Sequence, residues 1–268
     1  MKTKYDFLIG ISLYNTDTFL ENQIVNLKRC IEYSGLNVKI KYFDDGSNSD
    51  KAKFMKGICS DYSVDYHRYN HMGFGAICDE IGQESEIAEN CLILDSDVFL
   101  PDYFLSHAYQ IMYFRDEMCG VFSYKSIRIG FQDCYSLNIP NIQVFNHDAY
   151  NGGFTKPEPT TELATYTFLM DFSDYVAAGG FNRRYQAYYS DSDFCCRMAR
   201  AGFINYRLHF PKVFHVEHGT LQDPVNSFDV DKLRESDLKI FTDYWKRNPQ
   251  EIEKYFQEKW LCSKYLSA

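Results

Sequence analysis

The chain has 268 residues, of which 45% are hydrophobic and 17% aromatic, and its formal net charge is −9. A chain of this length and hydrophobic content can bury a sizeable core, which argues against intrinsic disorder. The negative charge argues against a broad nucleic-acid-binding surface, because such a surface needs clustered Lys and Arg. The composition therefore indicates a globular protein of one domain or two tightly joined halves, with room for a cation.

Strand and helix patterns alternate four times in the first hundred residues. The expected strands are 7–13, 38–43, 64–69 and 91–94, and the expected helices are 19–33, 51–58 and one that follows a turn at 71–75 and runs to about 87. Such alternation predicts an α/β fold with a mostly parallel central sheet and helices on both faces, whose ligands bind beyond the carboxyl ends of the strands. Ser12, Asp45 and Asp97 lie at those ends.

The pattern is looser after residue 101. The expected elements are a helix at 103–114, strands at 120–124 and 166–172, helices to 178 and at 192–201, and strands at 204–208 and 213–218. The stretch 130–162 is polar and contains Pro and Asn, so it is expected to form a lid or an acceptor loop. The tail 230–261 is charged and amphipathic, and Pro249 divides it, which predicts a pair of helices packed back on the domain.

Two further features suggest the compartment. The nine cysteines are scattered, and none forms a CxxC pair or a Cys/His cluster with the spacing of a zinc site, so we expect reduced thiols. No apolar stretch reaches the length of a membrane span, and Met1–Asp6 leads straight into a short apolar run. The sequence therefore predicts a cytoplasmic protein without a transmembrane segment.

The sequence Asp95-Ser96-Asp97 follows an apolar run that is too short for a helix. Period-two spacing places both carboxylates on the same side of the chain. A hard divalent cation that carries phosphate oxygens would relieve their mutual repulsion, so this is a candidate metal–diphosphate site. Taken alone, the pattern is also typical of a turn with a solvated cap, and other segments must decide between the two interpretations.

Five motifs occur in an ordered series along the chain. They are Ser12-Leu13-Tyr14-Asn15, Phe43-Asp44-Asp45-Gly46-Ser47, Asp95-Ser96-Asp97, Gly179-Gly180-Phe181-Asn182, and Ser190-Asp191-Ser192-Asp193-Phe194-Cys195-Cys196-Arg197 with Gly202-Phe203. In this order the chain resembles the family 2 glycosyltransferases of GT-A fold, from about Phe7 to at least His218. The resemblance implies a GT-A domain in which residues 1–101 bind the nucleotide sugar and residues 102–222 bind the acceptor, followed by a helical extension at 223–268.

The resemblance also implies roles in donor binding. Tyr14 would stack on the base, and Asp45 would accept a hydrogen bond from an imide nitrogen, which favours uracil or thymine, with Asp44 as the alternative acceptor. Ser12 and Gly73 complete the predicted nucleotide-binding residues. The pattern Asp44-Asp45-Gly46-Ser47 is equally typical of an ordinary turn that leads into a helix.

The predicted cofactor is a divalent cation, Mn²⁺ with Mg²⁺ as the alternative. Asp97 would bind it directly, and Asp95 would bind the ribose, a metal-bound water or the metal itself. By the resemblance His215 would be a further ligand, with His218 as a near competitor. A histidine in an apolar strand can also be a core residue, and that alternative stays open for His215.

By the same resemblance Asp191 would be the general base that takes the proton of the acceptor hydroxyl in an inverting displacement. Asp193 is the fallback base, and Gly180, Ser190 and Asp193 are the predicted acceptor-binding residues. Asp191 or Ser190 could also cap the helix expected from residue 192. The chain departs from the family at three places: Ser190 replaces a Glu, Cys78-Asp79 replaces an Arg-Asn pair, and Leu13 replaces a Pro.

The sequence thus predicts a metal-dependent, inverting glycosyltransferase that uses a nucleotide-diphosphate sugar, with a UDP-sugar favoured. The expected acceptor is a hydroxyl of a glycan or a lipid-linked saccharide, which could hold the protein at the periphery of a membrane. The alternatives are a non-catalytic sugar- or nucleotide-binding relative, a nucleotidyltransferase, and a modified nucleobase of DNA as acceptor. A nucleotidyltransferase would need a Gly-rich, basic phosphate loop, and Tyr14-Asn15-Thr16-Asp17 offers none.

Overall fold

The computed structural model describes residues 5–129, 157–160, 163–216 and 229–245. Within them the strands form one sheet in the order β3-β2-β1-β4-β8-β6-β9-β5, and β7 pairs with β9. The strands are β1 Tyr5–Leu13, β2 Val38–Asp44, β3 Asp65–Arg68, β4 Ala88–Asp95, β5 Val98–Phe99, β6 Cys119–Ile129, β7 Glu158–Thr160, β8 Thr167–Asp171 and β9 Ile204–Val216. The helices are α1 Leu20–Ser34, α2 Ser49–Asp61, α3 Phe74–Gly82, α4 Phe104–Phe114, α7 Phe172–Ala178, α8 Ser190–Ala201 and α9 Val230–Trp245.

The sheet is parallel in its first half and mixed in its second. Strands β3, β2, β1 and β4 pair in parallel, as the alternation of strands and helices predicts. Beyond β4 the sheet is mixed: β8 runs antiparallel to β4 and β6, β5 and β7 run antiparallel to β9, and β6 runs parallel to β9. The regular alternation of strands and helices stops at the same place in the sequence.

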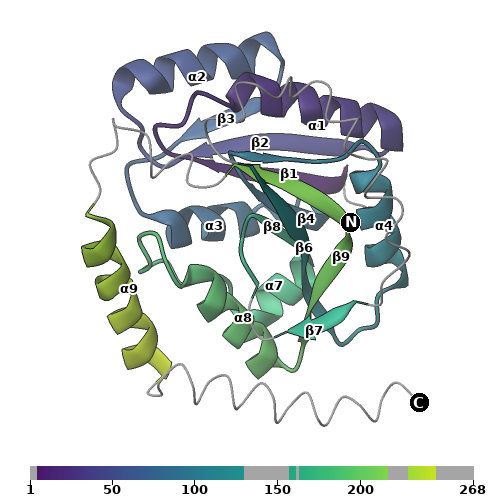
Figure 1. Ribbon diagram of the computed structural model, residues 1–268, viewed down its shortest axis with the longest axis vertical. Coiled ribbons are helices and arrows are strands. Elements are labelled where there is room, and N and C mark those ends of the chain that lie inside the picture. Colours follow the sequence, from purple (N-terminus) through teal and green to yellow (C-terminus); the bar gives the residue numbers. More distant parts are fainter. Residues whose placement is uncertain (1–4, 130–156, 161–162, 217–228, 246–268) are drawn as a thin grey trace.

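Helices cover both faces of the sheet (Figure 1), with α1, α2 and α4 on one face and α3, α7 and α8 on the other. The alternation of side chains along β1 supplies both cores: Phe7, Ile9 and Ile11 pack toward α1, and Leu8 packs toward α3. Gly10 lies on the α3 side, where an added Cβ would come within 2.3 Å of the Ile81 side chain. The glycine therefore lets α3 pack close to the sheet.

Most predicted elements are confirmed, and their boundaries differ in informative ways. Helix α1 ends as predicted, with Gly35 in the left-handed region at φ 66°. Helix α3 ends at Gly82 instead of near residue 87, because residues 84–87 turn into β4 with a hydrogen bond from Ile87 N to Glu84 O. The two strands expected between 204 and 218 are one strand, β9. The two-residue strand β5 has no counterpart among the predicted elements.

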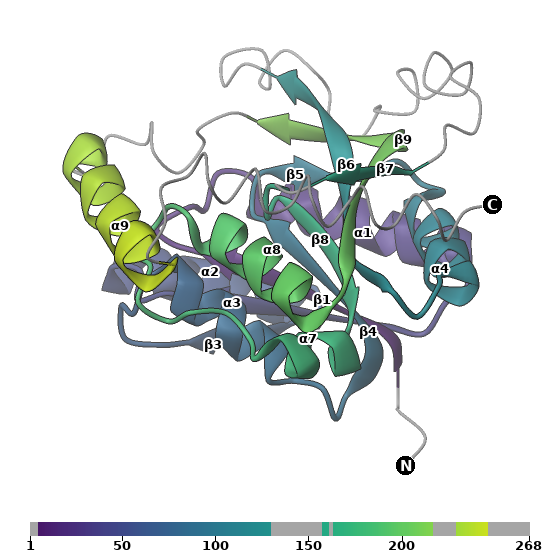
Figure 2. The same ribbon diagram turned by 90° about the horizontal axis from the view of Figure 1, so that it is seen from below.

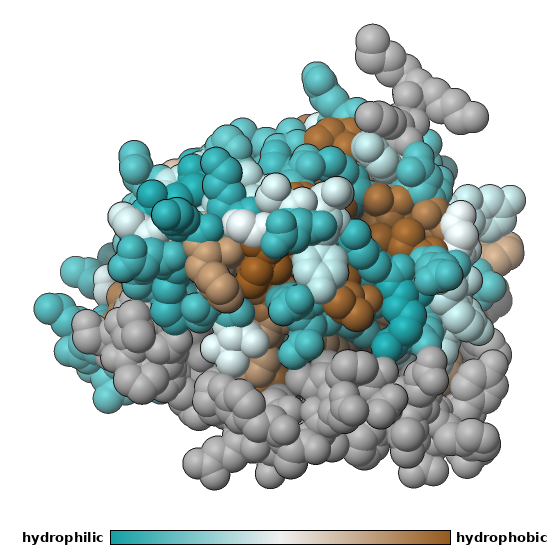
Figure 3. Space-filling view, turned by 90° about the horizontal axis from the view of Figure 1, so that it is seen from above, coloured by the Kyte–Doolittle hydropathy of each residue, from teal (hydrophilic) through white to brown (hydrophobic). Residues whose placement is uncertain are grey.

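The outer faces of α1 and α2 are largely polar. Figure 3 shows these helices' side of the molecule, where hydrophilic residues predominate and separate the apolar areas. The exposed large hydrophobic residues of the two helices are Val25, Tyr33 and Phe54. Both helices thus bury one apolar stripe, as amphipathic periodicity predicts.

Several expectations fall outside the described residues. These include nearly all of the predicted lid at 130–162, His218, and the second tail helix beyond Pro249. Within the described residues the seven cysteines are buried free thiols, in keeping with the expected reduced state. No helix in the part of the chain that the structure describes is both long enough and apolar enough to cross a membrane.

Candidate functional site

A cavity of about 310 Å³ lies at the carboxyl ends of β1, β2 and β4, which is where the α/β pattern predicts a ligand site. The turn before α3, residues 186–188 and α9 form further parts of its wall. The lining residues are Ser12, Leu13, Tyr14, Asp45, His71, Phe74, Ile77, Asp95, Ser96, Asp97, Thr165, Gln186, Ala187, Tyr188, His215 and Leu233.

Asp95, Asp97 and His215 meet at one side of this cavity, with their ligand atoms within 4.8 Å of one another. Strand β5 brings them together, because Val98 pairs with His215 and the backbone N–H of Val216 donates to the carbonyl oxygen of Asp97 at 3.0 Å. The His215 Nε2 atom lies 3.3 Å from Asp97 Oδ1. His215 is therefore a residue of the site and not a core histidine.

The cluster is short of hydrogen-bond donors. The Oδ1 atoms of Asp95 and Asp97 are buried and have no hydrogen-bond donor among the residues that the structure describes; the contact between His215 and Asp97 is not a hydrogen bond. Burial, the Asp97 charge and the Asp191 charge raise the pKa of Asp95 to about 7, and His215 opposes the shift. Two carboxylates and an imidazole suit Mn²⁺ or Mg²⁺, so the residues present fit the predicted cation.

Buried amides on α1 hold the loop that carries these ligands. Gln23 Nε2 donates to the carbonyl oxygens of Asp95 at 2.8 Å and Val98 at 2.9 Å. Asn26 exchanges two hydrogen bonds of 2.8 Å with the backbone of Leu100. The turn between β4 and β5 is therefore fixed by side chains from another element, which favours a preformed site.

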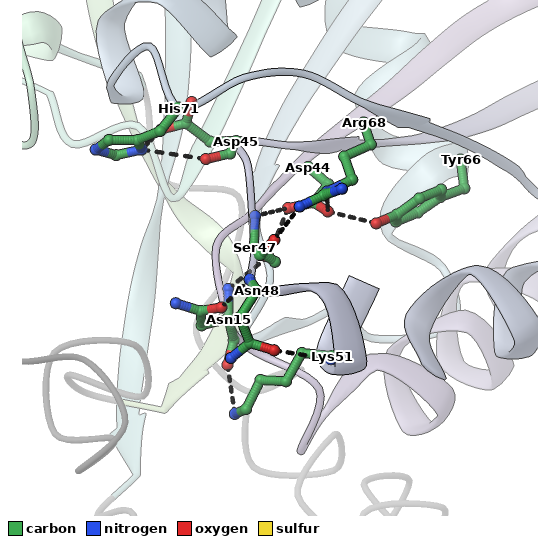
Figure 4. Close-up of polar contacts among 9 residues, drawn as sticks. All are labelled: Asn15, Asp44, Asp45, Ser47, Asn48, Lys51, Tyr66, Arg68 and His71. Carbon is green, nitrogen blue, oxygen red and sulfur yellow. Dashed lines mark hydrogen bonds and ion pairs between the residues drawn. The ribbon is translucent and has the colours of Figure 1, made fainter. Parts of the chain in front are cut away.

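The two aspartates after β2 have different roles (Figure 4). Asp44 is 0% exposed and accepts from Ser47 N at 2.9 Å and from the Tyr66 hydroxyl, and Arg68 lies 3.6 Å away. Its carboxylate is occupied by the turn and does not line the cavity. This geometry does not favour the alternative in which Asp44 reads the base.

Asp45 faces the cavity, and its carboxylate also holds the turn before α3. It accepts from Met72 N at 2.6 Å and Gly73 N at 3.0 Å, and His71 Nδ1 lies 2.9 Å away. Burial raises the pKa of Asp45, and these donors oppose the shift. The His71 ring lies 4.9 Å from the Tyr14 ring, so a histidine that the sequence analysis missed sits between the two predicted base-binding residues.

The loop after β1 is tied to the turn after β2. Asn15 N donates to Ser47 Oγ at 2.7 Å, Asn48 N donates to Asn15 Oδ1 at 2.8 Å, and Lys51 Nζ donates to the Asn15 carbonyl oxygen at 2.6 Å (Figure 4). The Asn48 side chain also caps α2 by accepting from Lys51 N. The Asp-Asp-Gly-Ser segment is thus both a turn into a helix and one wall of the cavity.

Asp191 lies in the first turn of α8, three residues after the cavity-lining Tyr188. The helix begins at Ser190, so the expectation that Ser190 or Asp191 precedes it as the cap is wrong; Tyr189 occupies that position with φ 62°. Asp191 Oδ1 accepts from Ser192 N at 2.8 Å, which orients the carboxylate. Its charge is near enough to Asp95 to raise the pKa of that group.

The three predicted acceptor-binding residues do not line the cavity. Asp193 is 0% exposed and accepts from Arg197 Nε at 2.6 Å, Trp245 Nε1 at 2.9 Å and the Tyr185 hydroxyl at 3.2 Å. Ser190 is 1% exposed. An added Cβ at Gly180 would lie 2.8 Å from Asp79 Oδ1, so this glycine permits close packing. All three residues are therefore part of the packed or hydrogen-bonded interior.

No protein-family model matches the sequence, and no curated protein matches it. Solved structures do match. GalNAc-T7 with UDP, GalNAc and Mn²⁺ has a TM-score of 0.60 at 11% identity, over 81% of this chain and 44% of that one. The mannosyltransferase PcManGT of Pyrobaculum calidifontis with GDP-Man and Mn²⁺ has a TM-score of 0.61 at 11% identity, over 96% and 69%.

A third similar structure is S. aureus TarS 1-349 with UDP-GlcNAc, at a TM-score of 0.59 and 12% identity, over 95% of this chain and 72% of that one. The chain therefore spans less than half of the GalNAc-T7 chain and about seven tenths of the other two. At these identities the similarity concerns the fold. The chain has a mixed α/β fold whose structural neighbours are glycosyltransferases of GT-A fold.

Proposed function

We propose that this protein is a metal-dependent glycosyltransferase that moves a sugar from a nucleotide diphosphate to a hydroxyl acceptor with inversion at the anomeric carbon. The observation that carries the proposal is the position of Asp95, Asp97 and His215. They form a donor-poor cluster on the wall of the same cavity that Tyr14 and Asp45 line. The groups proposed to bind the base and the diphosphate thus line one cavity.

Each group has a role that its geometry supports. Asp97 and His215 would bind the cation, with Asp95 as a further ligand or as a hydrogen-bond acceptor for the ribose. A bound divalent cation would supply positive charge to the departing diphosphate. Tyr14 would offer its ring to the base, and Ser12 lies beside it on the cavity wall at the end of β1.

The reaction would be a single displacement. The acceptor oxygen forms a bond to C1 of the sugar while the bond from C1 to the diphosphate oxygen breaks, and Asp191 takes the hydroxyl proton. The hydrogen bond from Ser192 N holds the Asp191 carboxylate at the start of α8.

We favour UDP as the nucleotide because a carboxylate at Asp45 can accept from an imide nitrogen. The neighbours do not decide the base, since two hold UDP or a UDP-sugar and one holds GDP-Man. Mn²⁺ is the first cation to test, because it accompanies GalNAc-T7 and PcManGT. The acceptor class remains that of the sequence prediction, a hydroxyl of a glycan or lipid-linked saccharide.

The first experiment is a panel of UDP- and GDP-sugars with and without Mn²⁺, scored by thermal stabilisation and by released nucleotide. We expect one donor to stabilise the protein only with metal, and its slow hydrolysis to release the nucleoside diphosphate. Asp97→Asn should abolish both signals, and Asp61→Asn, which changes an exposed carboxylate on α2, should retain them. Binding without turnover would indicate a non-catalytic relative, and release of sugar 1-phosphate instead of the nucleoside diphosphate would indicate a nucleotidyltransferase.

A further inference from the structure

Helix α9 places the carboxylate of Asp237 in the interior. Asp237 is 0% exposed. It accepts hydrogen bonds from three consecutive backbone N–H groups, those of Gln186 at 3.1 Å, Ala187 at 2.8 Å and Tyr188 at 2.8 Å. Among the described residues no ion pair joins Asp237, so the backbone dipoles supply the compensation that a buried charge requires.

The segment that Asp237 holds is a wall of the cavity. Gln186, Ala187 and Tyr188 all line it, and α8 with Asp191 begins directly afterwards. On its other side the segment contacts the turn before α3, because Phe74 N donates to the Gln186 carbonyl oxygen at 2.9 Å.

The glycine at the start of that turn makes this contact close. An added Cβ at Gly73 would lie 2.9 Å from Gln186 Cα, and Gly73 N is one of two backbone groups that donate to Asp45. The segment 186–188 is therefore held between α9 and the turn before α3, whose backbone N–H groups donate to Asp45. Because α8 begins directly after this segment, a change in its position would move the start of α8 and Asp191.

Other contacts of α9 fix the helix at this place, beside α8 in Figure 2. The Phe241 ring stacks on Tyr189 at 5.6 Å, and Arg234 lies 5.1 Å above the Tyr188 ring. Leu233 itself lines the cavity. The helix is thus part of the site, although it follows Asp191 by about forty residues and carries none of the five motifs.

We propose that Asp237 is a positioning residue, which fixes the cavity wall at residues 186–188 and thereby sets Asp191 against the reacting centre. The expected effect of Asp237 on turnover rests on the proposed function. Its expected effect on the position of residues 186–188 does not. Asparagine keeps the size of the side chain but loses the charge and exchanges one acceptor oxygen for an NH₂ group. Because Gln186 N lies within 3.2 Å of both carboxylate oxygens, its N–H faces this NH₂ group in either orientation. Asp237→Asn should therefore weaken the hydrogen bonds that hold residues 186–188 without creating a cavity in the core.

The test compares Asp237→Asn with Asp243→Asn, which makes the same charge change at an exposed position of the same helix. Backbone hydrogen exchange of residues 186–188 should accelerate at least tenfold in Asp237→Asn and stay unchanged in Asp243→Asn. The rate of transfer, expressed per UDP-binding molecule to exclude unfolded protein, should fall at least tenfold, while the UDP dissociation constant changes less than threefold. A general loss of folding would lower the number of UDP-binding molecules but not the turnover of each.

Two results would overturn the inference: unchanged exchange at residues 186–188, or turnover per UDP-binding molecule within twofold of the wild type. If the wild type transfers no sugar and hydrolyses no donor, the proposed function fails. In that case the exchange measurement alone decides whether Asp237 positions the wall. Asp237→Ala serves as the stronger variant, and its exchange should exceed that of Asp237→Asn.

Discussion

Replacement of Gln23 by leucine tests whether α1 holds the metal-binding turn in place. Gln23 is 0% exposed, and its amide makes three hydrogen bonds. It donates to the carbonyl oxygens of Asp95 and Val98 and accepts from the Tyr42 hydroxyl at 3.1 Å. Leucine has a similar size and removes all three bonds at once, so the change isolates hydrogen bonding from the volume of the core.

The expected cost follows from the groups that lose their partner. A buried polar group left unsatisfied costs about 1–3 kcal/mol, but each carbonyl oxygen keeps a second lone pair, so we expect the free energy of unfolding to fall by about 2–4 kcal/mol. For a chain of this length the melting temperature should fall by about 5–15 °C. Because the turn carries metal ligands, Mn²⁺ affinity should fall about 10–100-fold, as for other residues that orient a ligand.

Urea unfolding without metal measures the first effect, and calorimetric titration of the folded variant with Mn²⁺ measures the second. Gln110→Leu is the matched control, because it makes the same substitution at an exposed position of α4. Lost stability with wild-type Mn²⁺ affinity would refute the positioning argument and leave Gln23 as a core residue only. Unchanged stability would mean that the three hydrogen bonds do not contribute to folding.

Three further predictions concern carboxylates of the candidate site. Asp191→Asn should keep UDP affinity and melting temperature near the wild-type values while the transfer rate falls about 10²-fold or more, and an α-linked donor should give a β-linked product; near-full activity or an α-linked product would contradict the role. Asp45→Ala should weaken UDP binding and reduce the preference for UDP over CDP and GDP in calorimetric titrations, whereas an unchanged preference would leave Asp45 as a turn residue only. The pKa of Asp95 is about 7 in the folded protein and 3.8 in the unfolded chain, so between these values the folded protein binds an extra proton. The free energy of unfolding of the metal-free wild type should therefore fall, relative to that of Asp95→Asn, as pH rises from 5.5 to 8. Equal slopes for the two proteins in urea unfolding at these pH values would show that the pKa is not raised.

Local patterns predicted the first half of the fold well. The strands and helices of residues 5–95 follow simple periodicities, and Gly35 ends α1 where it was expected. The second half was less accessible because its pairing is not local. Strand β5 has two residues, too few for any period, yet it determines the position of His215 beside Asp97. The sequence could suggest His215 only through the family resemblance.

The sequence predicted the charged residues of the candidate site but not the residues that hold them in place. Asp95 ends β4 and Asp97 lies in the turn that follows, so their proximity is a local property of the sequence. Gln23 and Asp237 were missed, although each lies on the apolar stripe of an amphipathic helix, with Ile24 and Phe241 as buried neighbours. A polar residue at a position that the helical period assigns to the core is the signal that could have found them.

The buried carboxylates of this chain differ in how completely they are satisfied, and the difference identifies the site without any motif. Asp44, Asp193 and Asp237 each accept several hydrogen bonds from a turn, from side chains or from backbone, so folding alone accounts for them. Asp95 and Asp97 each keep a buried oxygen without a donor, beside an imidazole and on the wall of a cavity. Leaving two such oxygens unpaired destabilises the folded chain, and Gln23 nevertheless holds their loop in place. An arrangement that is costly without a partner and also preorganised is what a cation-binding site requires, which is why the metal assignment rests on this cluster more firmly than on the Asp-x-Asp pattern.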